Sequence, residues 1–110
     1  MPFSAGISVR NEGLHNTTGA ILASDLMEKI IATKFDDIIT NFGTYSEVQG
    51  KVRDANGNFF IDPAYAKFSR SATCVEKYYV AYPSARFILA KVQVSYDGKP
   101  IVVVNRLISK

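Results

Sequence analysis

The segment from Ala20 to Phe42 constrains the fold more than any other part of the chain, because its apolar residues recur at helical spacing. These residues are Leu22, Leu26, Met27, Ile30, Ile31, Phe35, Ile38, Ile39 and Phe42. The pattern predicts one amphipathic helix over residues 20–42, with an apolar stripe packed on the rest of the protein. Thr18 or Ser24 is placed to cap its start, and Gly43 to end it in a left-handed conformation.

Asp36 and Asp37 lie near the C-terminal end of this predicted helix. Carboxylates there oppose the helix dipole, at a cost of roughly a few tenths of a kcal/mol each. We therefore expect either a harmless exposed position or a contact with a cation. Adjacent helical residues diverge by about 100°, so these two side chains are not expected to share a proton.

After Gly43 the hydrophobic period changes from 3.6 residues to 2. Residues 48–61 are predicted to form a β-hairpin around the turn 54–58, and the segment that begins with Asp62-Pro63 to form one helical turn or a loop. Further strands are predicted over residues 73–82, 86–96 and 100–108, the last two joined by a tight turn at Asp97-Gly98.

The fold class is therefore predicted to be α+β, with one long helix packed on a mainly antiparallel sheet of about five strands in a meander of hairpins. Residues 1–110 form one domain in this prediction. It comprises an irregular N-terminal segment over residues 1–18, the helix over 20–42 and the sheet over 45–108.

The last two strands are nearly continuous in apolar residues, notably over 87–90 and 101–104. Strands of this kind are typically covered on both faces. One face is expected to meet the helix, and the other needs a second sheet, the N-terminal segment or another copy of the chain. We favour a homodimer formed through the sheet.

Composition excludes several classes of protein. The chain has one cysteine, Cys74, and one histidine, His15, so no disulfide or cysteine-based zinc cluster is expected within it. No metal or other cofactor is predicted. The early residues lack the pattern of a secretory signal, and no run is long enough to span a membrane, so a cytoplasmic location without membrane contact is expected.

The net charge of +3 is unevenly distributed. Residues 1–37 carry three basic and five acidic side chains, and the remainder carries ten basic and five acidic ones. Aromatic residues alternate with cations in the basic part, which is typical of surfaces that bind anions or stack nucleobases. The candidate residues for such a site are Arg53, Lys77, Tyr78, Tyr82 and Arg86.

Side chains of a strand point alternately to its two faces, so on the strand predicted over residues 73–82 Tyr79 would point away from Tyr78 and Tyr82. At least part of the aromatic and cationic set is therefore expected in the core.

No catalytic motif is recognisable, so a non-catalytic role is favoured for the chain, with a small enzyme kept as an alternative. If it were one, the expected pocket would lie between helix and sheet, with His15, Asp37, Glu76 and Tyr78 as its polar groups. The favoured function is a non-catalytic binding or assembly module that uses its sheet to bind a partner protein or a second copy. Binding of anions or single-stranded nucleic acid is the first alternative to this function, and the small enzyme is the second.

Overall fold

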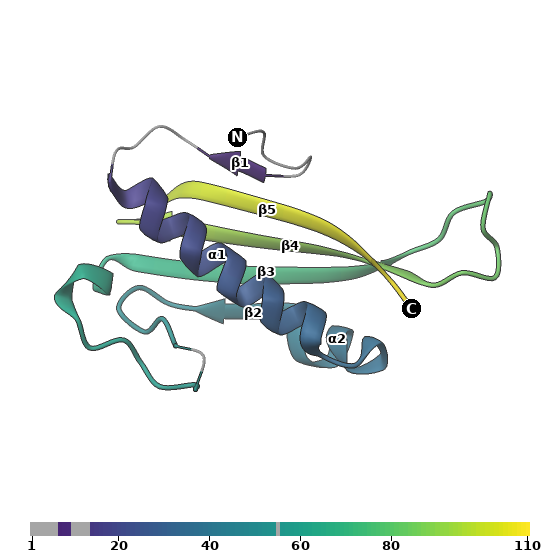
Figure 1. Cartoon of the computed structure of the whole chain (residues 1–110), viewed down its shortest axis with the longest axis horizontal. Coiled ribbons are helices and arrows are strands. Elements are labelled where there is room, and N and C mark those ends of the chain that lie inside the picture. Colours follow the sequence, from purple (N-terminus) through teal and green to yellow (C-terminus); the bar gives the residue numbers. More distant parts are fainter. Residues whose placement is uncertain (1–6, 10–13, 55) are drawn as a thin grey trace.

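Two helices cover one face of an antiparallel sheet in the computed structural model (Figure 1). The structure describes residues 7–9, 14–54 and 56–110. The sheet order is β1-β5-β4-β3-β2, so β2 to β5 form a meander and β1 joins the edge of β5. The strands are β1 (Ile7–Val9), β2 (Thr44–Glu47), β3 (Phe68–Lys77), β4 (Phe87–Tyr96) and β5 (Lys99–Ser109). The predicted α+β class is confirmed.

Two helices, α1 (Leu14–Ala32) and α2 (Phe35–Phe42), replace the single helix predicted over residues 20–42. The break falls at Thr33, whose hydroxyl donates a hydrogen bond to the Lys29 carbonyl, and at Lys34, which is extended with a ψ of 137°. A threonine hydroxyl that occupies a helix carbonyl favours bending or ending the helix. The change of direction lets α2 pack on β2 and β3 while α1 crosses β4 and β5.

The predicted helix ends were wrong in detail. α1 begins at Leu14, so Thr18 and Ser24 lie inside the helix and cap nothing. Gly43 follows α2 with a φ of −56°, which is right-handed. Glycine suits this position for a different reason, since a Cβ would lie 2.5 Å from the Ile39 carbonyl oxygen.

The break also reverses the prediction for Asp36 and Asp37. Both lie in the first turn of α2, not in the last turn of a long helix. Carboxylates at a helix N-terminus stabilise the helix through its dipole. Asp36 also makes the cation contact that the sequence allowed, with Arg86 and Lys110.

The N-terminal segment predicted to be irregular over residues 1–18 holds regular structure where it is described. β1 pairs with β5 through the partners Ile7↔Val104 and Val9↔Val102, and α1 starts at Leu14. The predictions for residues 1–6 and 10–13 lie outside the described residues.

β4 and β5 lie close to their predicted positions, whereas β3 begins at Phe68 instead of Thr73 and ends at Lys77. Serines at alternate positions of its first half face away from the helices, which makes this half of the strand resemble a loop in sequence. Of the helical turn and the loop that the sequence left open after Asp62, the structure has the turn, a 3₁₀ helix over Pro63–Tyr65.

The hairpin predicted over residues 48–61 has its turn but not its strands. The Asp54 N–H donates to the Asn58 carbonyl at 2.7 Å, and Gly57 has a φ of 85°. The flanking residues form only one isolated bridge, between Arg53 and Phe59. The turn predicted at 97–98 is confirmed, with positive φ at both residues.

The core lies between the helices and the inward face of the sheet. Its largest fully buried side chains include Leu22, Leu26, Ile30, Ile38, Val92, Val94, Ile101 and Val102. A β-bulge beside Val94 lets both Ile101 and Val102 be buried in succession. Gly19 permits the close approach of α1, because a Cβ there would lie 2.8 Å from the Ile101 side chain. Cys74 is buried in this layer, and burial raises the pKa of its thiol.

In the described part of the chain no helix is both long enough and apolar enough to cross a membrane.

Candidate functional site

A buried ion pair joins the two strands at one edge of the sheet. Glu47 on β2 and Arg70 on β3 are register partners, and their side chains are only 2% and 4% exposed. The Arg70 Nε donates to Glu47 Oε1 at 2.7 Å, and the second guanidinium contact reaches Oε2 at 3.2 Å. A charged pair this deeply buried is costly unless its remaining polar atoms are also satisfied.

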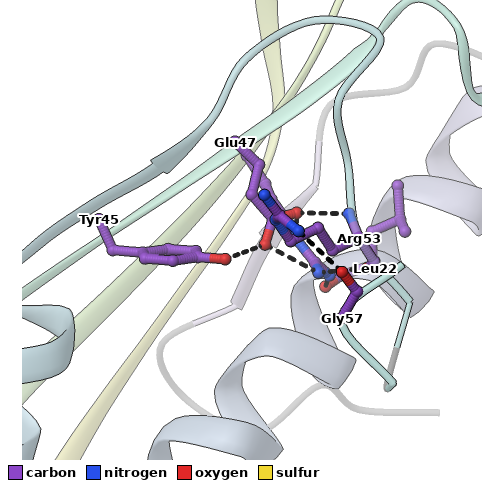
Figure 2. Close-up of polar contacts among 6 residues, drawn as sticks. Leu22, Tyr45, Glu47, Arg53 and Gly57 are labelled. Atoms are coloured by element: carbon purple, nitrogen blue, oxygen red, sulfur yellow. Dashed lines mark hydrogen bonds and ion pairs between the residues drawn. The ribbon is translucent and has the colours of Figure 1, made fainter. Parts of the chain in front are cut away.

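Neighbouring groups supply those remaining partners (Figure 2). Arg70 also donates to the carbonyls of Leu22 and Arg53, and Glu47 accepts from the Arg53 N–H and the Tyr45 hydroxyl. Burial and the hydrogen bond to Glu47 raise the pKa of Tyr45 to about 12, so its phenol remains a donor. The network uses both oxygens of Glu47 and four of the five N–H groups of Arg70, and it fixes α1, β2, β3 and the loop after β2 relative to one another.

A hollow of about 360 Å³ lies beside this network, between α1 and the loop after β2. Asp25, Glu28 and Asp54 face Lys29, Arg53 and Arg70 around it. The two signs of charge are balanced, so the lining selects neither anions nor cations. The described residues contain no cluster of three or more histidine, cysteine or carboxylate side chains that could hold a metal ion.

His15 belongs to an aromatic cluster at the same end of the molecule. Its ring stacks on Tyr96 with centroids 3.7 Å apart and meets Phe68 edge-on. Phe68 in turn lies near Tyr65, which stacks on Phe60. The cluster closes the end of the core, and His15 serves in it as a packing residue.

The four polar groups considered for an enzyme do not meet in one site. His15 contacts Phe68 at the start of β3, whereas Glu76 and Tyr78 lie at its other end. Eight strand residues separate the two places, about 26 Å at about 3.3 Å per residue.

Four of the five candidate anion-binding residues lie together at the opposite end of the molecule. Lys77, Tyr78, Tyr82 and Arg86 belong to the β3–β4 hairpin, which projects beyond α2 (Figure 1). Arg53 lies instead beside the buried ion pair, where its guanidinium donates to the Gly57 carbonyl and covers the Phe59 ring. The structure therefore separates Arg53 from the other four.

An exposed ion-pair network holds the base of this hairpin to α2. Arg86 contacts Asp36 at 2.9 Å and Glu76 at 3.0 Å, and Lys110 also contacts Asp36. Hydrogen bonds from Lys110 and Arg86 lower the pKa of Asp36, and those from Tyr78 and Arg86 lower the pKa of Glu76. The charge of Arg86 is thus already matched within the chain.

The tyrosines of the hairpin are not core residues. β3 ends before them, so the strand alternation expected to bury part of the set does not apply, and Tyr78, Tyr79 and Tyr82 are all exposed. The aromatic and cationic residues that alternate in the sequence run from Tyr65 to Arg86, and the buried ones among them are Phe68 and Arg70.

The face of the sheet away from the helices, here called the open face, has an apolar end. Cross-strand pairing aligns Val75 of β3, Leu89 of β4 and Leu107 of β5 in one row. Val75 is 53% exposed and Leu107 46%. Phe87 lies in the next row, and the rings of Tyr79 and Tyr82 meet it edge-on. These six residues form the hairpin-end surface.

The other half of the open face is polar. A shallow hollow of about 360 Å³ lies there over β2, β3 and β4. The hydroxyl and amide side chains at its border are Ser46, Gln49, Ser69, Ser71, Gln93 and Ser95. We call this the hydroxyl-lined hollow. Apart from the hairpin tyrosines at Phe87, no described helix or strand packs on the open face, so these residues do not supply the cover that the apolar strands predicted.

Sequence reasoning missed two of these features. The signal for the apolar row was present in the alternate apolar residues of β4 and β5, but the row itself depends on register. The buried pair was missed because the sequence predicted a loop around Arg70.

Comparison of the chain with known protein families, curated proteins and solved structures finds no significant match.

Proposed function

We propose that the protein is a non-catalytic assembly module that binds a second copy of itself through the hairpin-end surface. The observation that supports this most directly is the row Val75–Leu89–Leu107, which is exposed at Val75 and Leu107 and half-buried at Leu89, and which Phe87 and the hairpin tyrosines continue. Contiguous apolar surface rimmed by polar residues is typical of interaction sites. Tyrosine and phenylalanine are also enriched in protein interfaces.

The chemistry of the rest of the molecule supports binding over catalysis. The acceptors of Glu47 and the guanidinium of Arg70 are engaged inside the protein, and His15 is packed between rings. The hairpin-end surface contains no side chain of a typical nucleophile or metal ligand. This surface can contribute apolar area to binding, and the burial of apolar area favours association with another protein surface.

A second copy is the favoured occupant, because identical patches meet in a two-fold symmetric dimer. Among the described residues, the open-face positions of β2 to β5 include no carboxylate, so no unpaired acid would be buried. Lys77 on β3 and Lys91 on β4 lie one row to either side of the apolar row.

Sedimentation velocity at micromolar concentration tests the proposal. The unchanged protein is expected to be a dimer, and Leu107→Lys is expected to be a monomer, because a buried unpaired ammonium opposes association. Ile61→Lys is the matched control, since Ile61 is 96% exposed but lies in the loop before β3. A protein that is monomeric at these concentrations contradicts the proposal.

Binding of anions or single-stranded nucleic acid is a second candidate, favoured by the location of Lys77, Tyr78, Tyr82 and Arg86 on one hairpin. The pairing of Arg86 with Asp36 and Glu76 weakens this candidate. Gel-shift titration with single-stranded DNA and RNA at low salt tests it, and salt-sensitive retardation that Lys77→Gln reduces would support it.

A further inference from the structure

The hairpin and the hydroxyl-lined hollow lie at matching distances on either side of the apolar row. Ser71 on β3 precedes Val75 by four residues. Tyr79 follows Val75 by four, two residues beyond the end of β3, and its ring meets Phe87 on the open face. On β4, Phe87 and Lys91 lie two residues to either side of Leu89. Side chains two or four residues apart on a strand share a face. A projecting aromatic loop and a polar hollow are therefore placed symmetrically about the row.

We propose that two copies pack open face to open face about a two-fold axis that runs along this row, and that each hairpin enters the partner's hydroxyl-lined hollow. This inference rests on the proposed function and specifies the surface that the second copy covers. This axis reverses the strand direction between the copies. Because the row lies along the axis, each residue of the row faces the same residue of the other copy. Tyr79 of one copy then faces Ser71 of the other.

The lysines select this axis over the other simple arrangement. With the axis along the row, Lys91 on β4 faces the ring of Phe87 in the other copy, and Lys77 on β3 faces Thr73. Cations bind favourably over aromatic rings. An axis along β4, the central strand of the three that carry the row, would instead bring the two Lys91 side chains opposite each other, which like charges disfavour.

The chemistry of the hollow fits a tyrosine. Its border carries four serine hydroxyls and two glutamine amides, all able to donate and accept hydrogen bonds. Tyr79 and Tyr82 are exposed, and within the described residues neither hydroxyl has a hydrogen-bond partner. A phenol brings apolar area and one polar group, which makes it a suitable occupant for a hydroxyl-lined hollow at the end of an apolar row.

Cross-linking of single-cysteine variants tests the arrangement in the full-length chain. Tyr79→Cys and Ser71→Cys are made separately in a Cys74→Ala background, which removes the one native cysteine, and are mixed at micromolar concentration. A short bis-maleimide is the probe, because facing sheets lie about 10 Å apart and disulfides need Cα atoms within about 7 Å. Circular dichroism verifies that each variant is folded.

We expect the mixture to give a cross-linked dimer whose bridging peptides join residues 79 and 71. Tyr79→Cys mixed with Ile61→Cys is the matched control and is expected to give at least about tenfold less product. Efficient cross-linking of Lys91→Cys with itself in a stable dimer, without the 79–71 product, would overturn this arrangement and leave the proposed function intact. A monomer at the same concentration would overturn both.

Discussion

The two ion-pair networks of the molecule use the same chemical groups in opposite surroundings. Glu47 and Arg70 are almost fully enclosed, and every acceptor on the carboxylate is used. Asp36, Glu76 and Arg86 lie at the hairpin end, where side-chain exposures range from 30% to 62%. Water can replace the partners of the exposed network, but it cannot easily reach those of the buried one.

The difference indicates separate roles for the two ends of the sheet. The enclosed pair ties together backbone from α1 and the loop after β2, so its loss affects the whole fold. The exposed network joins the hairpin base to α2 and leaves the hairpin-end surface free. Substitutions at the two ends should therefore separate stability from assembly.

The largest stability effect is expected at the buried pair. Arg70→Met leaves Glu47 enclosed without its cation and should lower the free energy of unfolding by about 3–5 kcal/mol. Urea denaturation followed by circular dichroism measures the change. The double variant Glu47→Leu with Arg70→Met removes both charges and should be more stable than Arg70→Met alone. If the double variant is less stable than Arg70→Met, the loss in Arg70→Met does not come from the unpaired carboxylate of Glu47.

A smaller effect is expected from the two tyrosines that donate to carboxylates. Tyr45→Phe removes a partly enclosed hydrogen bond to Glu47 and should cost about 1–2 kcal/mol. Tyr78→Phe removes the matching bond to the exposed Glu76 and should leave the urea midpoint unchanged. If Tyr45→Phe and Tyr78→Phe lose equal stability, the buried and the exposed network do not differ in what their tyrosine hydrogen bonds contribute.

The ionisation of the Tyr45 phenol reports by spectroscopy how well the buried network is enclosed. Its pKa is raised from 10.0 to about 12 in the folded protein, so the folded state keeps a proton that the unfolded state releases. Stability from this group is complete below about pH 10 and is lost as the pH rises toward 12. Ultraviolet titration should show one tyrosine that ionises at a higher pH than the others, and Tyr45→Phe should remove this step. If no such step is seen, the Tyr45 hydroxyl is exposed to water.

Local patterns predicted the elements of the fold better than the contacts between them. The apolar period located the helical region, and the Asp97-Gly98 pair located the last turn. The break at Thr33 escaped prediction because the apolar period continues across it to Phe35 and Ile38, and one threonine inside a helical pattern is a weak signal for a helix end.

The candidate sites depended still more on pairing between distant residues. Arg70 and Glu47 are 23 residues apart in the chain and meet only when β2 and β3 pair. The candidates Lys77, Tyr78, Tyr82 and Arg86 were adjacent in sequence and remained adjacent in space, but Arg53 did not join them. Proximity in sequence was thus informative within one hairpin and uninformative beyond it.

Acid should abolish the small stabilising effect of the exposed contacts of Asp36. Hydrogen bonds from Lys110 and Arg86 lower the pKa of Asp36 in the folded protein below its usual 3.8. A lowered carboxyl pKa stabilises the fold above the unfolded value and stops doing so as the pH falls through the folded value. Asp36→Asn should therefore shift the urea midpoint slightly at about pH 7 and progressively less below about pH 4. Asp25→Asn is the control, because Asp25 is exposed on α1 with no ion pair among the described residues. If both variants respond alike to pH, the contact between Asp36 and the hairpin base contributes nothing to stability.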